Sequence, residues 1–159
     1  MKKLFLALVA VFALSMTVNA QNNLGVRLGG GQGFGTELSW QHDLGSNRLE
    51  LDLGWHDGDY WNDINLVGIY QWRGSISGNF GWYAGVGAGL TIVTWDNGHD
   101  GDGDFALGVA GQAGLEYKFN AVPLQLSLDI RPRLNIINPY SDGMDFHWGD
   151  IALGIRFCF

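Results

Sequence analysis

The chain has 159 residues, of which 47% are hydrophobic and 13% aromatic, with 25 glycines and three prolines. Its formal net charge of -7 excludes a dominant basic surface of the kind that binds nucleic acid. The single cysteine, Cys158, excludes an intramolecular disulfide framework.

Residues 1–20 have the pattern of a secretory signal peptide. Lys2 and Lys3 precede the apolar run 4–16, and Ala20 ends a segment suited to signal peptidase cleavage. The alternative is an N-terminal membrane anchor, but the run is shorter than the ~20 residues that a membrane-spanning helix needs. No cysteine follows the signal directly, so we expect no lipid anchor. We expect residues 21–159 to form the mature protein, as one domain.

Past residue 20, apolar residues alternate with small or polar ones at a period of two. This period is typical of β-strands that have one apolar face. We predict eight strands, at residues 24–29, 34–41, 49–56, 64–73, 82–92, 105–119, 124–133 and 150–159.

The first two predicted strands are joined by the glycine run 29–33. The run lacks the lysine of a phosphate-binding loop, and no helical pattern follows it, so it indicates a hairpin. A turn at 43–47 leads to the third strand. There Glu50 and Asp52 occupy alternate positions, and such carboxylates must face a lumen rather than lipid.

The fourth predicted strand is the least regular, because Val67, Gly68 and Ile69 blur the alternation. The inward glycines of the fifth strand leave room for long side chains from across a narrow lumen. The expected connections around and after these strands are loops or turns at residues 56–63, 74–81, 95–104, 120–123 and 135–149.

The inward face of the predicted strands carries balanced charges, six cations and six anions. They are Arg27, Glu37, Glu50, Asp52, Arg73, Glu116, Lys118, Asp129, Arg131, Arg133, Asp150 and Arg156. Because an eight-stranded barrel is only wide enough for its own side chains, we expect these charges to fill the lumen as structural ion pairs. Arg48 is not counted among these lumen charges, and its charge is taken to offset that of Asp43. The alternatives are a proton or ion path, or a buried acid/base pair.

The predicted connections alternate in charge. Those after the third, fifth and seventh strands collect nine aspartates, which are Asp57, Asp59, Asp63, Asp96, Asp100, Asp102, Asp104, Asp142 and Asp145. This predicts acidic extracellular loops, with plain turns and both termini on the periplasmic side. Outward aromatic residues cluster at the periplasmic end, while Trp55 and Phe105 fall at the other, as two interfacial girdles would.

Ligand and catalytic candidates are few. Alternating carboxylates at 100–104 could bind calcium, but Phe105 and Gly111 stand where the EF-hand pattern requires glycine and glutamate, which favours a solvated loop. Ser141, Asp142 and His147 could form a hydrolytic set only within one loop, and His42, His56 and His99 lie near strand ends or in loops. We expect no catalytic residue, no metal and no cofactor.

The signal peptide, the eight alternating strands and the ending Ile-Ala-Leu-Gly-Ile-Arg-Phe-Cys-Phe resemble the small outer-membrane β-barrels of the OmpX and OmpA transmembrane-domain type. The resemblance implies that Ile155, Phe157 and Phe159 are the signal read by the barrel-assembly machinery. The family includes structural proteins, adhesins, complement-evasion factors and lipid A-modifying enzymes. The deacylase branch carries His-x-Ser on a late strand, whereas Trp148 and Gly149 follow His147 here.

The sequence therefore predicts an all-β fold, an eight-stranded antiparallel up-and-down transmembrane β-barrel without a pore. We expect a monomeric outer-membrane protein that contacts outer-membrane lipid and acts in adhesion, surface interaction with extracellular ligands, or envelope integrity, and not as an enzyme. The alternatives are a lipid A-modifying barrel enzyme and a soluble lipocalin-like carrier, which would keep its apolar face inside.

Overall fold

The computed structural model describes residues 21–29, 35–57, 61–95, 104–137, 143–148 and 151–159. Its strands are β1 (Asn22–Gly29), β2 (Gly35–Leu44), β3 (Asn47–Asp57), β4 (Trp61–Ser77), β5 (Phe80–Trp95), β6 (Asp104–Lys118), β7 (Leu124–Ile130), β8 (Arg133–Ile137), β9 (Asp145–His147) and β10 (Ile151–Cys158). No helix in these segments is long and apolar enough to cross a membrane.

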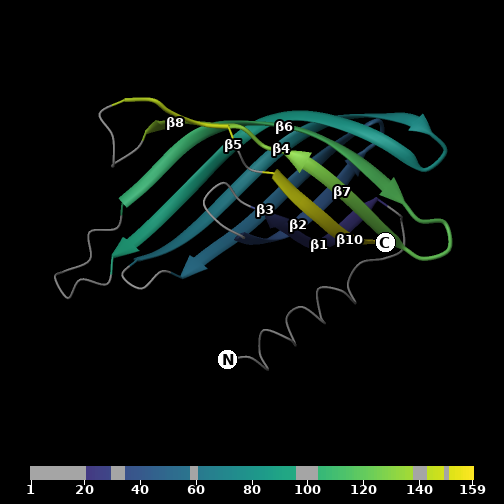
Figure 1. Ribbon diagram of the computed structural model, residues 1–159, viewed down its shortest axis with the longest axis horizontal. Coiled ribbons are helices and arrows are strands. Elements are labelled where there is room, and N and C mark those ends of the chain that lie inside the picture. Colours follow the sequence, from purple (N-terminus) through teal and green to yellow (C-terminus); the bar gives the residue numbers. More distant parts are fainter. Residues whose placement is uncertain (1–20, 30–34, 58–60, 96–103, 138–142, 149–150) are drawn as a thin grey trace, which may run out of the picture.

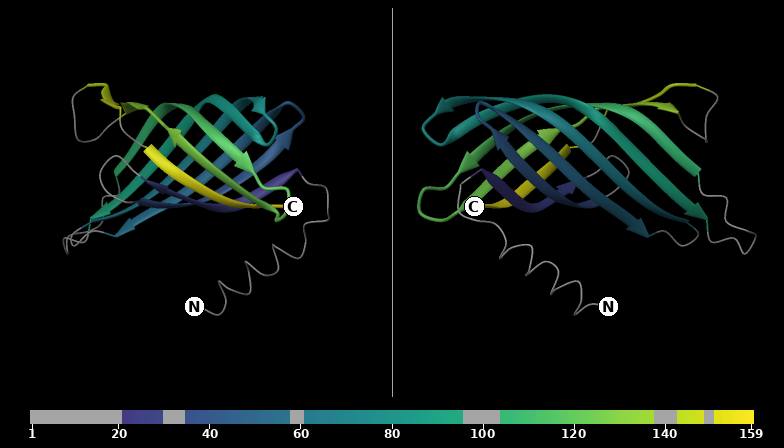
Figure 2. Two further views of the ribbon diagram at one scale, coloured as in Figure 1. Left: turned by 45° about the vertical axis from the view of Figure 1, so that its right-hand side comes forward. Right: turned by 180° about the vertical axis from the view of Figure 1, so that it is seen from behind.

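The strands form one antiparallel sheet that closes on itself. β1 pairs with β2 on one side and with β10 on the other, and the ring is completed through the pairing of β5 with β6. β7 and β8 both pair with β6 and together form the seventh strand of the barrel wall, which we call the β7 stave, and β10 forms the eighth. The predicted eight-stranded antiparallel barrel is therefore confirmed. The staves are steeply tilted, and β4, β5 and β6 run longer than β1, β7 and β10 (Figures 1 and 2).

Asn22, at the start of β1, and Phe159, the last residue, lie together at one end of the barrel, which we call the terminal end. There the backbone nitrogen of Asn22 donates to the carbonyl oxygen of Phe159 at 3.0 Å, and the nitrogen of Phe159 donates to the carbonyl of Asn22 at 2.9 Å. The turns between β2 and β3, β4 and β5, and β6 and β7 lie at this end. Two of them are two-residue turns that begin with Gly45 and Gly78, whose φ angles are 72° and 55°, as type II′ hairpins require.

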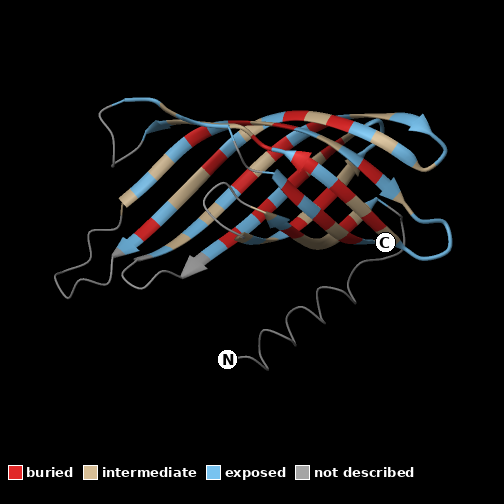
Figure 3. Cartoon of the chain, viewed as in Figure 1, coloured by how far each residue is buried: buried red, intermediate tan, exposed pale blue. Residues whose placement is uncertain are grey.

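The side chains alternate as predicted, with apolar residues facing outward and polar residues facing inward. This is the reverse of the arrangement in a soluble barrel. Buried and exposed residues alternate along each stave (Figure 3). Apolar side chains such as Val86, Leu128 and Ile151 are exposed on the outside, whereas Arg27, Glu50 and most other inward charges are buried. The wall of this barrel is therefore apolar outside and polar inside.

The fourth predicted strand, whose alternation is the least regular in the sequence, is present and is longer than predicted. β4 is the longest strand, with 17 residues, and Val67 and Ile69 keep its alternation because both point inward and are fully buried. With Ala110 of β6 they form a small apolar cluster inside the barrel. The phase looked blurred only because these two inward residues are apolar.

Several predicted connections are shorter than expected. Pairing of β3 with β4 extends into the predicted loop 56–63 as far as Asp57 and Asn62, and pairing of β4 with β5 reduces the predicted turn 74–81 to Gly78 and Asn79. The seventh strand is broken at Pro132, which cannot donate to the ladder. The loop 135–149 holds the end of β8 and all of β9, which pair with each other as a hairpin.

Replacing Gly87 with alanine is expected to disrupt the pairing of β4 with β5. An added Cβ would overlap the backbone carbonyl oxygen of Gly68, which cannot move without separating the strands. We expect most of this variant to fail to reach the folded form in a heat-dependent gel-shift assay. Gly111→Ala is the control, because its Cβ would meet Pro132 Cγ at 3.6 Å and the carbonyl oxygen of Gly85 at 4.0 Å, both ordinary contacts. Equal folding of the two variants would contradict this close approach.

Candidate functional site: a charged network in the barrel lumen

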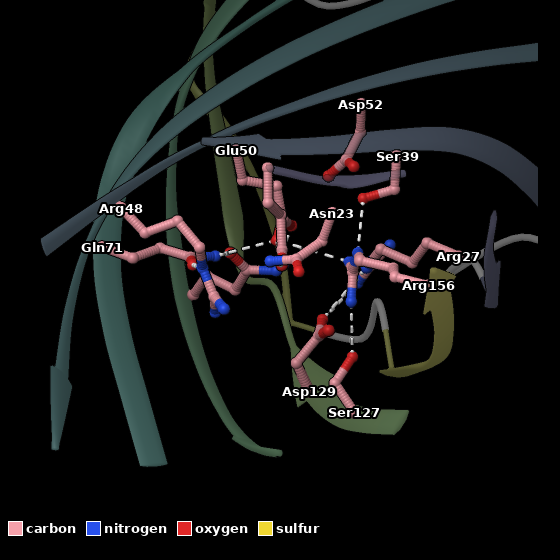
Figure 4. Close-up of polar contacts among 12 residues, drawn as sticks. Asn23, Arg27, Ser39, Arg48, Glu50, Asp52, Gln71, Ser127, Asp129 and Arg156 are labelled. Carbon is pink, nitrogen blue, oxygen red and sulfur yellow. Dashed lines mark hydrogen bonds and ion pairs between the residues drawn. The ribbon is translucent and has the colours of Figure 1, made fainter. Parts of the chain in front are cut away.

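The lumen is filled by a network of charged side chains, which we call the central network. It consists of Arg27, Glu37, Arg48, Glu50, Asp52, Glu116, Asp129, Arg131 and Arg156, supported by neutral polar residues. Every member except Glu37 is buried as a residue, and the side chain of Glu37 is 12% exposed. Figure 4 shows polar contacts among twelve residues of this region, ten of them labelled, which come from strands around the barrel.

One half of the network centres on Arg27 of β1. Its Nη1 lies 3.1 Å from Glu37 Oε2, and its Nη2 lies 2.6 Å from Asp129 Oδ1. Arg131 also contacts Glu37, and it donates from Nη1 to Asp52 Oδ2 at 2.7 Å. These bonds tie β1, β2, β3 and the β7 stave together across the lumen.

The other half centres on Glu50 of β3. Its carboxylate accepts from Arg156 at 3.3 Å, from Gln71 at 3.0 Å and from Gln112 at 2.9 Å, and it also contacts Gln41. Arg156 reaches from β10 and donates to Ser39 and Ser127 as well (Figure 4). A buried carboxylate with four donors is fully solvated by the protein in place of water.

Tyr83 of β5 joins the two halves. Its hydroxyl donates to Asp129 Oδ2 at 2.9 Å, and its ring lies 5.0 Å from the guanidinium carbon of Arg48. Arg48 in turn donates to Glu116 at 2.7 Å and to Gln71 at 2.6 Å. Arg48 therefore belongs to the lumen charges, and its omission from the predicted set is wrong. It shares the inward parity of Glu50 and Asp52 on β3 and is fully buried.

Glycines in the wall make room for this filling. A Cβ at Gly114 would meet Tyr83 Cζ at 2.6 Å and Asp129 Cβ at 2.7 Å, and a Cβ at Gly54 would meet Glu37 Cγ at 3.2 Å. The network therefore depends on small wall residues opposite long ones.

The remaining predicted lumen charges lie above and below the network. At the terminal end, Arg73 and Lys118 contact Asp43 at 3.0 Å and 3.7 Å, and the side chain of Lys118 is 38% exposed. Towards the other end, Arg133 donates to Asn65 at 3.2 Å and to Thr91 at 3.4 Å. Asp150 lies outside the described residues.

Asp43 is also corrected by these contacts. Its backbone lies across from Arg48 in the register of β2 and β3, but its carboxylate faces inward and pairs with Arg73 and Lys118 instead. The sequence carries a signal for this placement, because Asp43 follows Glu37, Ser39 and Gln41 at every second position of β2, and these three side chains point inward.

Aromatic residues ring the outside of the terminal end in pairs. Stacked or edge-on contacts join Trp40 to His42, Tyr70 to Trp72, Tyr117 to Phe119 and Phe157 to Phe159. Each pair lies in the last part of a strand that runs towards the terminal end, or just beyond its last residue, and Tyr70 and Trp72 lie across from the start of β3. Ile155 precedes the last pair on the outward face of β10.

At the opposite end, the β8–β9 hairpin adds a pair that the sequence analysis placed in a loop. Phe146 and Trp148 are exposed and make an edge-on contact with ring centroids 4.7 Å apart. Phe146 pairs across from Leu134, on the same outer face as Trp55 and Phe105. The β8–β9 hairpin therefore continues the outward-facing apolar surface of the barrel wall.

A hollow of about 510 Å³ lies on the outside of the wall over β5, β6, β7 and β10. Its outward-facing lining includes Trp82, Leu115, Leu128 and Ile130, around the opposed small residues Ala84 and Ala113. It is an indentation in the apolar outer face, with no titratable side chain on that face.

The candidate catalytic residues do not form a site in the described part of the chain. His42 faces outward, with Nδ1 2.9 Å from Asn22 Oδ1. His147 Nε2 lies 2.9 Å from Asp145 Oδ2 on β9. Ser141, Asp142, His99 and the side chain of His56 lie outside the described residues, as do residues 100–103 of the candidate calcium loop. Within the described ranges, no three potential ligands gather as a metal site would require.

Comparison with known proteins gives the fold. No family model matches the sequence, and no curated protein does. The structure is similar to the N-terminal β-barrel domain of Pseudomonas aeruginosa OprF, with a TM-score of 0.69 and 14% identity over 89% of this chain and 98% of that one. It is also similar to Neisserial surface protein A, with a TM-score of 0.60 and 15% identity over 87% and 95%. The chain has the fold of the small outer-membrane β-barrels.

Proposed function

We propose that this protein is an integral outer-membrane β-barrel that spans the bilayer without an open pore. The observation that carries the proposal is the inverted polarity of the barrel, with guanidinium and carboxylate groups buried in the lumen and large aliphatic side chains exposed around the wall. In water this wall would be a large apolar surface of the kind that marks a membrane or protein contact. In a bilayer it is the surface that lipid covers.

The height of the wall supports a membrane span. Phe105 and Tyr117 both face outward on β6, twelve residues apart. At ~3.3 Å per residue and a tilt near 40°, they are separated by roughly 30 Å along the barrel axis, close to the thickness of a bilayer core. The aromatic pairs at the terminal end and Phe146 with Trp148 at the other lie where interfacial girdles belong.

The lipocalin-like alternative requires the opposite polarity. A soluble carrier keeps an apolar pocket inside and charges outside, whereas the described lumen is filled by the central network. Among the described side chains, no arrangement specifically favours the enzyme alternative.

The proposed role is presentation of the acidic, aromatic loops at the cell surface, for adhesion or envelope integrity. Removing the two lysines of the expected signal changes the net charge from -7 to -9. This surface would favour basic or cation-bridged partners and repel nucleic acid. The proposed partners are outer-membrane lipid, the barrel-assembly machinery and extracellular ligands, and the proposed state is a monomer.

Comparison of producing cells with deletion cells tests this role. We expect protease treatment of intact cells to cleave the outer loops, and we expect lipid A to have the same mass spectrum in both strains. A change in the acyl chains of lipid A would contradict this role and support the alternative of a lipid A-modifying enzyme. As a matched variant, Asp96, Asp100 and Asp102 are changed to asparagine, which should weaken surface attachment while leaving the folded amount unchanged.

A further inference from the structure

The central network contains more acids than bases. Its four guanidinium groups, those of Arg27, Arg48, Arg131 and Arg156, face five carboxylates, those of Glu37, Glu50, Asp52, Glu116 and Asp129. If all nine are ionised, the network carries one negative charge in excess in a space shielded from water. An uncompensated buried charge costs several kcal/mol in a protein interior.

The charges at the two ends of the lumen do not supply the missing cation. The pair of cations at the terminal end, Arg73 and Lys118, is engaged with Asp43 and is partly exposed. Arg133 lies towards the other end, where Asp63 and Asp104 share the inward parity of buried Val93. Counting all of these described groups still leaves eight carboxylates against seven cations.

Asp52 is the acid of the network with the fewest donors. It is 1% exposed, its Oδ2 accepts from Arg131, and its Oδ1 has no hydrogen-bond partner among the described residues. Glu50, by contrast, has four donors, and Asp129 accepts from Arg27 Nε, Arg27 Nη2 and Tyr83. A buried carboxylate oxygen without a donor is the atom at which a positive charge would be most effective.

The groups around Asp52 are themselves charged. Glu50 is the next inward residue of the same strand, and Glu37 of β2 shares Arg131 with Asp52. The cations that face this part of the lumen are Arg131 and, from β10, Arg156, which is engaged with Glu50. Arg131 is thus divided between two carboxylates.

We propose that the central network binds one proton, carried on Oδ1 of Asp52. The proton comes from bulk water, no other bond forms or breaks, and the network becomes neutral with four guanidinium groups and four carboxylates. Asp52 then holds its bond from Arg131 through Oδ2 and offers an O–H donor on its other oxygen. This site lies beyond the proposed surface role and does not depend on it.

Infrared spectroscopy of the detergent-folded protein at neutral pH tests the proposal. A protonated carboxyl group absorbs at a higher frequency than a carboxylate, and carbon-13 labelling of aspartate shifts the band. We expect the wild-type protein to show one such aspartate band, Asp52→Asn to lose it, and Asp43→Asn to keep it. Asp43 is the matched control, because it is also an inward aspartate but lies outside the central network, paired with Arg73 and Lys118, so its removal leaves the network's excess of one carboxylate unchanged.

Absence of the band from the labelled wild-type protein would overturn the proposal, and so would its survival in Asp52→Asn. The wild-type measurement alone shows whether a protonated aspartate is present, so the proposal can be tested even if a variant fails to fold. If the protein lacks the protonated-aspartate band and added sodium stabilises it, the site binds a small cation instead. That result would also overturn the proposal that Asp52 carries a proton.

Discussion

Arg27→Met is expected to destabilise the folded barrel by about 3–5 kcal/mol, the usual cost of removing one partner from a buried ion pair. Arg27 is 1% exposed and holds both Glu37 and Asp129. Methionine fills much of the same volume but leaves those carboxylates with one cation fewer. Equilibrium unfolding in urea, with the barrel in lipid vesicles, measures the change.

Lys118→Met is the matched control, because it makes the same change at the exposed end of the lumen. Lys118 lies 3.7 Å from Asp43, and we expect the loss to be below about 1 kcal/mol. Equal losses for the two variants would show that the central network contributes no more to stability than a surface ion pair.

Deletion of Phe159 is expected to remove most of the assembled protein from cells. In the folded barrel it removes the two backbone hydrogen bonds with Asn22 and the stacking on Phe157. Those two bonds contribute about 1–3 kcal/mol, too little by themselves to prevent folding. We therefore expect near-normal refolding in detergent but a large loss of heat-shifted barrel in the outer membrane, which would support the proposed assembly signal at Ile155, Phe157 and Phe159.

Phe119→Ala is the control for this deletion. Phe119 is also an exposed aromatic of the terminal girdle, paired with Tyr117, but it lies in the middle of the chain. If it lowers assembly in cells as much as the deletion does, the effect belongs to the girdle in general and the signal reading of the last strand is wrong.

The fold could be predicted from the sequence because, in the strands of a membrane barrel, outward apolar residues alternate with inward small or polar residues. Each residue in the wall has only two environments, so Glu50 and Asp52 fix the inward face of β3 and Leu51 and Leu53 fix the outward one. Apolar residues such as Val67 and Ile69 also fit inside, so apolarity is the weaker guide to direction. Charge is the stronger guide.

Other features could not be predicted because they depend on contacts between distant strands. Arg48 shares the inward parity of Glu50 and Asp52, but it lies next to a turn, and the structure shows that the strand extends to include it and that it contacts Gln71, Glu116 and Tyr83. The β8–β9 hairpin is similar, because Pro132 interrupts the pattern and β9 has only three residues. The glutamines that surround Glu50 carry no charge and so gave no signal of their own.

The most direct test of the membrane-barrel proposal is detergent phase partition of the mature protein, followed by electrophoresis with and without boiling. An apolar wall around a polar lumen predicts recovery in the detergent phase and a band that moves when the sample is boiled. Recovery in the aqueous phase, with no change on boiling, would contradict the proposal.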